Sequence, residues 1–314
     1  MDLVAGFIYL LMGGDLLVRG AVALARRLQV SPVVVAATVV GFGTSLPEMV
    51  VSLQATLTGY PGLILGNVVG SNIANVLLVG GASACVYPLL HDDPAVRRNA
   101  VIMLASGFGF AAMALTGSIT RGGGMALLGT FAVIMLLTAR STIQAKQDAD
   151  PSTPLDWVLG LPSQLWMILA FILGGLIMLP LGADRLVSSA VSIAGRFGVP
   201  EAVVGLTVLA VGTSLPELST TVLAALERRS DIAIGAIVGS NTFNVLTIMG
   251  LTATVSGHPI AVPPRFLVMD LPVMLLTSSV LAFYAWTARP LGRNAGVAML
   301  LAYATYLGTL YFVV

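Results

Sequence analysis

Most of this chain consists of apolar runs of about 18–25 residues, separated by short stretches that carry most of its charges. A run of that length crosses a lipid bilayer as a single α-helix. Only 9% of the residues are charged, whereas a soluble domain carries roughly a quarter. The pattern therefore predicts an all-α polytopic membrane protein.

Ten transmembrane helices are expected. We place them at about residues 3–25, 32–58, 61–85, 97–117, 122–140, 164–194, 201–226, 231–255, 265–287 and 291–313. The only sustained polar stretch begins at residue 144, and it divides the chain into a first unit at 1–143, a linker at 144–163 and a second unit at 164–314. Each unit contains five of the predicted spans.

The two units repeat each other at a constant offset of 169 residues, without a gap. The motif GTSLPE at 43–48 recurs at 212–217, and GSNIAN at 70–75 is matched by GSNTFN at 239–244. Because the offset crosses five spans, an odd number, equivalent residues face opposite sides of the membrane. The sequence therefore predicts two inverted five-helix repeats, which is the architecture of many secondary transporters.

Each GTSLPE motif places a proline inside an apolar span. Pro47 and Pro216 have no N–H group, so the carbonyl groups of Gly43 and Gly212 lose their helical donors. Within a membrane, such carbonyl groups are tolerated only where they line a cavity or meet an ion. We therefore expect a broken turn that faces an internal site in each half.

The same motifs also bury a carboxylate. Glu48 and Glu217 each cost about 2.5–3.5 kcal/mol at bilayer depth, and neither predicted span contains a Lys or Arg. A bound cation is the simplest compensation, and a protonated glutamate that is hydrogen-bonded to a neighbouring helix is the alternative.

The residues around the two glutamates supply oxygen ligands. These are Thr44, Ser45, Ser71 and Asn75 in the first half, and Thr213, Ser214, Ser240 and Asn244 in the second. An all-oxygen set suits hard cations such as Ca²⁺ and Na⁺. Two carboxylates balance one Ca²⁺ but not Ca²⁺ and several Na⁺ together, so competition for one site predicts antiport.

These paired motifs resemble those of the cation/calcium exchanger superfamily, specifically its prokaryotic Na⁺/Ca²⁺ exchanger branch, over nearly the whole chain. The resemblance implies that Glu48 and Glu217 are shared by both ions and that Thr44 and Thr213 complete a Ca²⁺ site. It also implies flanking Na⁺ sites, built from Ser45 with Ser71, from Ser214 with Ser240, and from carbonyl groups near Gly41 and Ala210, with Asn75 and Asn244 at the midpoint. Spans 1 and 6 would slide past this core.

The resemblance implies a secondary active antiporter that exchanges Na⁺ for Ca²⁺ by alternating access, without a cofactor beyond the transported ions. Proton-coupled or K⁺-dependent exchange of Ca²⁺ stays open, because glutamates can bind protons and because some relatives carry aspartate where this chain has Asn244. A passive channel and an intramembrane hydrolase are less favoured. His91 and His258 lie outside the motif spans, so the chain is not expected to be an enzyme.

Arginine and lysine collect in the loops of one membrane face, including Arg26, Arg97 and Arg140. The positive-inside rule then places the N-terminus and the C-terminus outside and the linker in the cytoplasm. We expect an inner-membrane protein of a prokaryote whose partners are inorganic cations and lipid. Neither nucleic acid nor an obligate protein partner is indicated.

Overall fold

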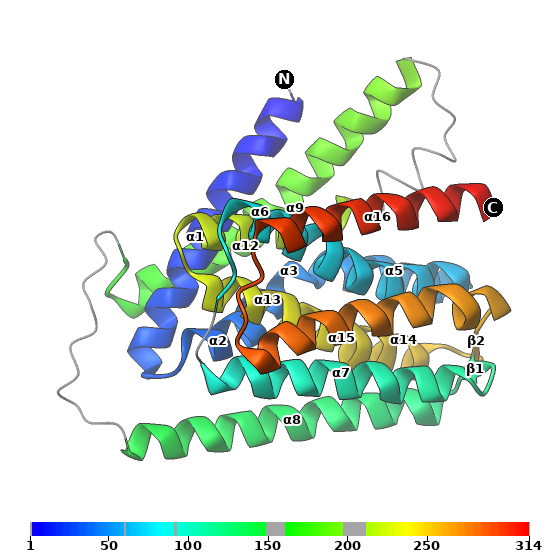
Figure 1. Cartoon of the computed structure of the whole chain (residues 1–314), viewed down its shortest axis with the longest axis horizontal. Helices are drawn as coiled ribbons and strands as arrows, with labels where there is room; N and C mark the ends of the chain where they lie inside the picture. Colours follow the sequence, from blue (N-terminus) through cyan, green and yellow to red (C-terminus); the bar gives the residue numbers. More distant parts are fainter. Residues whose placement is uncertain (1, 60, 91–92, 149–160, 197–211, 314) are drawn as a thin grey trace.

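The computed structural model describes residues 2–59, 61–90, 93–148, 161–196 and 212–313, which are almost entirely helical (Figure 1). The first half contains α1 (Asp2–Leu28), α2 (Pro32–Val35), η1 (Ala36–Val40), α3 (Gly41–Thr44), α4 (Leu46–Thr58), α5 (Pro61–Ala74), η2 (Asn75–Gly80), α6 (Gly81–Val86), α7 (Pro94–Ala114) and α8 (Arg121–Asp148). The second contains α9 (Leu165–Arg196), α12 (Leu215–Leu226), α13 (Ser230–Phe243), η4 (Asn244–Ile248), α14 (Met249–Val255), η5 (Phe266–Asp270), α15 (Leu271–Thr287) and α16 (Arg293–Val313). Two short strands, β1 (Ser118–Ile119) and β2 (Ile260–Ala261), pair antiparallel.

Six of the described helices are long and apolar enough to cross a membrane, or seven if a pair bent by 45° at residues 44–46 counts as one span. The prediction of a helical membrane protein agrees with this finding, and the count of ten remains a prediction. Residues 201–211 of the seventh predicted span lie outside the described residues, as do residues 149–160 of the linker. The helix α8 ends at Asp148, past the predicted boundary at 140, because the polar residues that follow include good helix formers.

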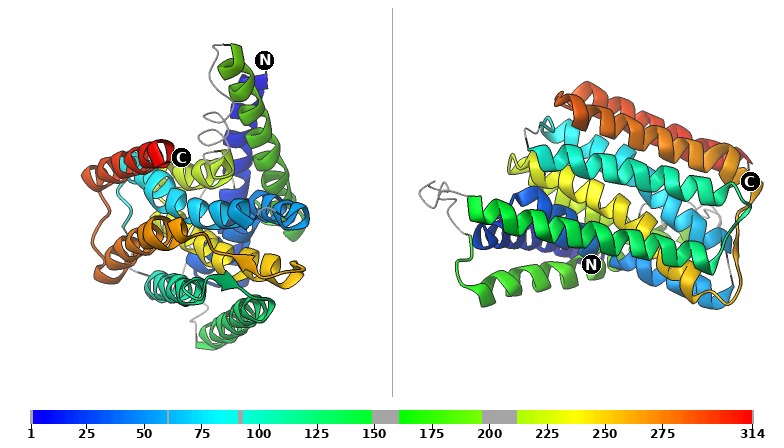
Figure 2. Two further views of the ribbon diagram at one scale, coloured as in Figure 1. Left: turned by 90° about the vertical axis from the view of Figure 1, so that its right-hand side faces the viewer. Right: turned by 90° about the horizontal axis from the view of Figure 1, so that it is seen from below.

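Helices α1 and α9 lie side by side and cross the other helices at a steep angle (Figure 2). Glycines let their backbones touch: a Cβ atom on Gly175 would lie 2.7 Å from the carbonyl oxygen of Gly13, and one on Gly182 would lie 2.9 Å from that of Gly6. The pairing order makes the two helices antiparallel. The hydroxyl of Ser219 on α12 donates to the carbonyl of Leu10 on α1 at 2.5 Å, which ties this pair to the rest of the bundle.

The serines of the two GTSLPE motifs have the same backbone conformation, and a helix begins directly after each of them. The backbone angles are φ −86° and ψ 7° at Ser45, and φ −88° and ψ 5° at Ser214. Pro47 and Pro216 lie in the first turn of these helices, where a missing N–H group has no cost. The two copies therefore share one local conformation.

Wider π-helical turns also recur. The turns η2 and η4 begin at Asn75 and Asn244, which are separated by the repeat offset. The turn η5 has no such counterpart, because residues 97–101 are regular α-helix within α7. The residues that correspond to η1, 205–209, lie outside the described residues. A π-helical turn accommodates one extra residue and is frequent at functional sites.

The motifs lie in the most buried part of the bundle. The apolar window of Ser230–Val255 is 94% buried, whereas that of Arg121–Arg140 is 11% buried. Helix α13 packs directly on η1 and α3, and a side chain on Gly239 would collide with the carbonyl of Ala37. This close approach brings the first GTSLPE motif next to the second GSN motif.

Candidate functional site

The GTSLPE and GSN motifs of both halves meet at the centre of the bundle. Glu48 and Glu217 are 0% and 1% exposed. The hydroxyl of Ser45, from the first half, donates to Oε1 of Glu217, from the second half, at 3.0 Å. Since Ser45 directly precedes the helix that carries Glu48 in its first turn, this bond brings the carboxylate of one half to the motif of the other.

A second set of contacts closes the gap between α3 and α13. The hydroxyl oxygens of Thr44 and Ser240 lie 3.4 Å apart, and Ser240 donates to the carbonyl of Gly41 at 3.2 Å. Gly41 leaves no room for a side chain, because a Cβ atom would lie 2.8 Å from the backbone nitrogen of Ser240. The structure thus brings together three residues that the sequence named as ligands.

The asparagines form an exchanged pair of hydrogen bonds. Asn75 donates through Nδ2 to Oδ1 of Asn241 at 3.1 Å, and Asn244 donates in the same way to Asn72 at 3.3 Å. Asn244 also donates to the hydroxyl of Ser71 at 3.0 Å. These bonds occupy the amide nitrogens and leave the amide oxygens of Asn75 and Asn244 free to accept.

Several oxygen atoms of these motifs are buried without any hydrogen-bond partner among the described residues. They are both carboxylate oxygens of Glu48, Oε2 of Glu217, the hydroxyl of Ser214, and Oδ1 of Asn75 and Asn244. Buried polar atoms are nearly always paired, because an unpaired one costs free energy. A hard cation satisfies several such oxygens at once, so the donor chemistry fits Ca²⁺ or Na⁺ as cargo.

Apart from the two glutamates, the ligand set is made of hydroxyl, amide and carbonyl oxygens. No group of three or more His, Cys, Asp or Glu side chains suited to a metal ion lies in the described part of the chain. His258 is exposed in the loop between α14 and β2, away from the two carboxylates. His91 and Ala210 lie outside the described residues.

The two sides of the site do not make equivalent contacts. The repeat counterpart of the Ser45–Glu217 bond is a bond from Ser214 to Glu48, and this bond is not formed. Ser71 and Thr213, the counterparts of Ser240 and Thr44, instead line a cavity of about 470 Å³. The two halves therefore differ in their contacts although their motifs are the same.

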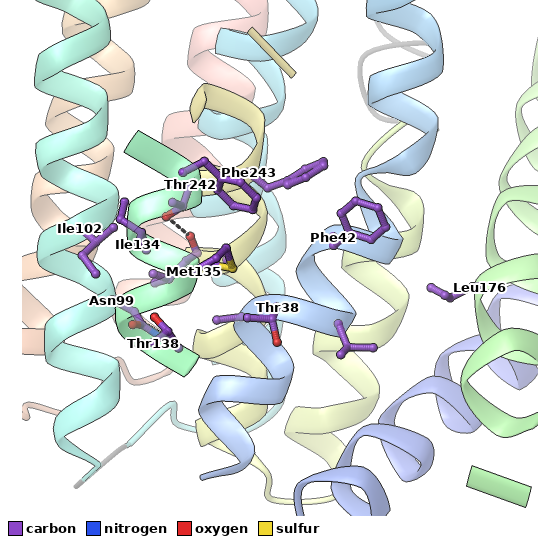
Figure 3. A pocket seen from close by; sticks show the side chains of 15 residues that line it. Thr38, Phe42, Asn99, Ile102, Ile134, Met135, Thr138, Leu176, Thr242 and Phe243 are labelled. Carbon is purple, nitrogen blue, oxygen red and sulfur yellow. Dashed lines mark hydrogen bonds between the residues drawn. The ribbon is translucent and has the colours of Figure 1, made fainter. Parts of the chain in front are cut away.

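A second cavity, of about 340 Å³, flanks α3 and α13 (Figure 3). Phe42 and Phe243 stand at its wall with their rings edge to face at 4.9 Å. Next to them, Gly43 packs so tightly on Leu176 of α9 that a side chain there would collide. Gly212, its repeat counterpart, is buried at the start of the second motif.

Asn67 contacts the site but is not repeated in the second half, so a comparison of the two halves does not reveal it. Its amide nitrogen donates to the backbone carbonyl of Glu48 and to the hydroxyl of Ser52, both at 2.8 Å. The equivalent residue in the second half is Ala236, so no repeated motif marks the position. The available signal is its spacing, because Asn67 lies four residues before Ser71 on one face of α5.

Comparison with known proteins agrees with this chemistry. The family model described as sodium/calcium exchanger protein matches residues 3–140 and 167–312. The inner membrane protein YrbG of Escherichia coli is 33% identical over 99% of this chain and 96% of its own length. The sodium/calcium exchanger MaX1 of Methanosarcina acetivorans is 30% identical over 99% of this chain and 98% of its own.

A solved structure of the sodium-calcium exchanger NCX_Mj, soaked with zero Na⁺ and Ca²⁺, superposes with a TM-score of 0.82 and 28% sequence identity. The match covers 98% of this chain and 97% of the solved one. The chain is an integral membrane protein whose family consists of ion exchangers and not of enzymes. It belongs to the sodium/calcium exchanger protein family.

Proposed function

We propose that the protein is a secondary active antiporter that exchanges Na⁺ for Ca²⁺ at one shared site between Glu48 and Glu217. The observation that supports this most strongly is that three of their four carboxylate oxygens are buried without a hydrogen-bond partner among the residues that the structure describes. Together the two groups carry a charge of −2, which one Ca²⁺ balances. Na⁺ ions that occupy the same oxygens exclude Ca²⁺, and this competition couples the two fluxes.

Alternating access requires two related but inverted halves, and several contacts support that architecture of ten helices in two five-helix repeats. Gly6 meets Gly182 while Gly13 meets Gly175. Since Gly175 and Gly182 are the repeat counterparts of Gly6 and Gly13, the two contacts exchange under a two-fold axis. The matched backbone conformations at Ser45 and Ser214 support the same relation.

The asymmetry of the site supports a one-sided state. Contacts of Ser45 and Thr44 close the side formed by α3 and α13, whereas Ser71 and Thr213 line a cavity. With both termini outside the inner membrane of a prokaryote and the linker in the cytoplasm, the closed side faces the cytoplasm. To open the other side, α1 and α9 would slide past the core. The contacts of Ser45 and Thr44 would then break, and their counterparts at Ser214 and Thr213 would form.

Exchange of Ca²⁺ for protons or with a K⁺ requirement is the second candidate. Proton exchange is favoured by the two glutamates, which can bind protons. The K⁺ requirement stays open because Asn244 leaves two acids in the site in place of three.

The test is uptake of ⁴⁵Ca²⁺ into proteoliposomes that are loaded with Na⁺, with K⁺ or with acidic buffer. We expect uptake from Na⁺-loaded vesicles and its loss in Glu48→Gln and in Glu217→Gln. Ser83→Ala is the matched control, because the Ser83 hydroxyl is buried and has no hydrogen-bond partner in the described part of the chain, yet it lies outside both motifs. Uptake that ignores the Na⁺ gradient and follows the pH gradient would overturn the choice of coupling ion.

A further inference from the structure

A third carboxylate shares a cavity with residues of the cation site. The cavity of about 470 Å³ that Ser71 and Thr213 line is also lined by Asp270, Arg265 and Tyr306. Asp270 ends the π-helical turn η5 and is 4% exposed. An ionisable side chain at such a place in a membrane protein is expensive and marks an ion pathway by default.

The Asp270 carboxylate is only half satisfied. The hydroxyl of Tyr306, on α16, donates to Oδ1 of Asp270 at 2.8 Å. Oδ2 accepts no hydrogen bond from any residue that the structure describes. One carboxylate oxygen is thus free toward the cavity, beside a hydroxyl oxygen that is itself able to coordinate.

The nearest basic residue does not neutralise this charge. Arg265 lies five residues before Asp270, so the π-helical turn places both on one helix face. Even so, the described residues contain no ion pair between them, and Nε of Arg265 is buried without a partner. A cation in the cavity is therefore free to meet the carboxylate, while the guanidinium group weakens its binding.

The charged side chains of this cavity are absent from the described lining of its repeat counterpart in the other half. The cavity in Figure 3 is the repeat counterpart of this one, since its Ile134, Thr138 and Gly239 are offset by 169 from Tyr303, Leu307 and Gly70. No charged side chain stands among its described lining residues. The counterparts of Asp270 and Tyr306 are Val101 and Leu137.

We propose that Asp270 and the Tyr306 hydroxyl form a second, weaker site for a hard cation, in which an ion waits before it moves to Glu48 and Glu217. The delivery step rests on the proposed function, whereas binding does not. A single carboxylate with an arginine in the same cavity holds a cation loosely enough to release it. The site serves only the side of the protein onto which this cavity opens.

Binding is tested with Tb³⁺, whose emission is sensitised by a tyrosine close to the bound ion. The Glu48→Gln/Glu217→Gln double variant removes the central site, so the remaining tyrosine-sensitised emission reports on weaker sites. We expect saturable emission that falls to background when Asp270→Asn is added and that falls strongly with Tyr306→Phe. Emission that Asp270→Asn leaves unchanged would overturn the proposal, whether or not the protein exchanges Na⁺ for Ca²⁺.

Transport measured separately from each membrane face tests delivery. Asp270→Asn keeps an acceptor for Tyr306 but removes the charge. We therefore expect the half-saturating Ca²⁺ concentration to rise about 30-fold on one face only, as for a divalent ion about 4 Å from one unit charge in water. Arg265→Gln should lower that concentration on the same face, and Tyr306→Phe should raise it less than Asp270→Asn. A silent Asp270→Asn combined with an impaired Tyr306→Phe would show a structural hydrogen bond and refute the site. A wild-type protein without Na⁺-driven uptake would refute the proposed function and leave the Tb³⁺ result to decide this one.

Discussion

Ser45 and Ser214 hold equivalent positions in the two halves and share one backbone conformation, yet their hydroxyl groups have different surroundings. Ser45 donates to Glu217, whereas the hydroxyl of Ser214 is buried without a partner in the described part of the chain. This one hydrogen bond therefore distinguishes the two halves of the molecule. The same bond brings the two halves together at the carboxylates.

The two serines are therefore expected to respond differently to alanine. Ser45→Ala should lower the free energy of unfolding of the cation-free protein by about 1–3 kcal/mol, because it leaves a buried acceptor unpaired. Ser214→Ala should leave it nearly unchanged. Denaturant unfolding in detergent, with EDTA and without Na⁺, makes the comparison, and equal losses in both variants would contradict the described state.

Asn67→Ala removes two hydrogen bonds that join α5 to α4, one to the carbonyl of Glu48 and one to the hydroxyl of Ser52, about one turn further on. We expect a loss of about 1–3 kcal/mol in stability and weaker Ca²⁺ binding, because Glu48 is held less firmly. Ser83→Ala serves as the control for the loss of a buried polar group. Ca²⁺ binding that stays at the wild-type level in Asn67→Ala would show that the amide stabilises the fold without positioning the carboxylate.

The candidate residues that the two halves share could be predicted from the sequence, because a Glu, Ser or Asn that is repeated in an apolar span has few purely structural explanations. The sequence could not name Asn67, since the second half holds Ala236 there and uses the hydroxyl of Thr221 on the carbonyl of Glu217. Nor could it show that Asp270 is buried and bonded to Tyr306 across 36 residues. Such contacts depend on how helices pack, which no local pattern encodes.

At the scale of helices, the interface of α1 and α9 is built from glycines that bring two backbones into contact. Association of this kind lets helices approach closely and depends on small residues in lipid. Buried side chains of both helices, among them Leu17 and Leu179, pack beside these glycine contacts. The hydroxyl bond from Ser219 to Leu10 is one polar contact that sliding of these helices past the core would break.

Gly175→Ala should slow transport and lower stability, because its Cβ atom would lie 2.7 Å from the carbonyl oxygen of Gly13. The neighbouring variant Gly174→Ala is the matched control, since its Cβ atom would make an ordinary contact of 3.5 Å with Leu16. Initial rates of ⁴⁵Ca²⁺ uptake and melting temperatures measure both effects. Identical behaviour of the two variants would mean that the backbones of α1 and α9 are not in close contact.

Pro47 and Pro216 predict the change of backbone conformation at Ser45 and Ser214, because the missing N–H group has a fixed effect on the preceding turn. The π-helical turns have no comparable signal, since each lasts for about one turn, which is too short for its wider period to stand out in the hydrophobic pattern. The turn η5 shows the limit most clearly, because it occurs in one half only.

At the scale of the whole molecule, the helical membrane architecture follows directly from the lengths of the apolar runs. The inversion of the two halves rests on the odd number of spans between equivalent residues, and it makes a prediction about sidedness. Thr120 and Arg289 are separated by the repeat offset, and both are exposed near helix ends. Inverted halves must place them on opposite faces of the membrane.

Sidedness is checked by labelling single cysteines in a Cys85→Ala background. In intact cells, a membrane-impermeant maleimide should modify Thr120→Cys, and it should modify Arg289→Cys only after permeabilisation. This result follows if the N-terminus is outside. Labelling of both positions from the same side would rule out inverted repeats, and labelling in the reverse order would keep the repeats but reverse the orientation.

Equilibrium binding of ⁴⁵Ca²⁺ to the purified protein in detergent tests most directly whether two carboxylates from opposite halves hold one ion. We predict one tightly bound Ca²⁺ per chain, displaced by Na⁺, and lost in Glu48→Gln and equally lost in Glu217→Gln while Ser83→Ala retains it. If either glutamine variant bound Ca²⁺ as tightly as the wild-type protein, the shared site would not exist.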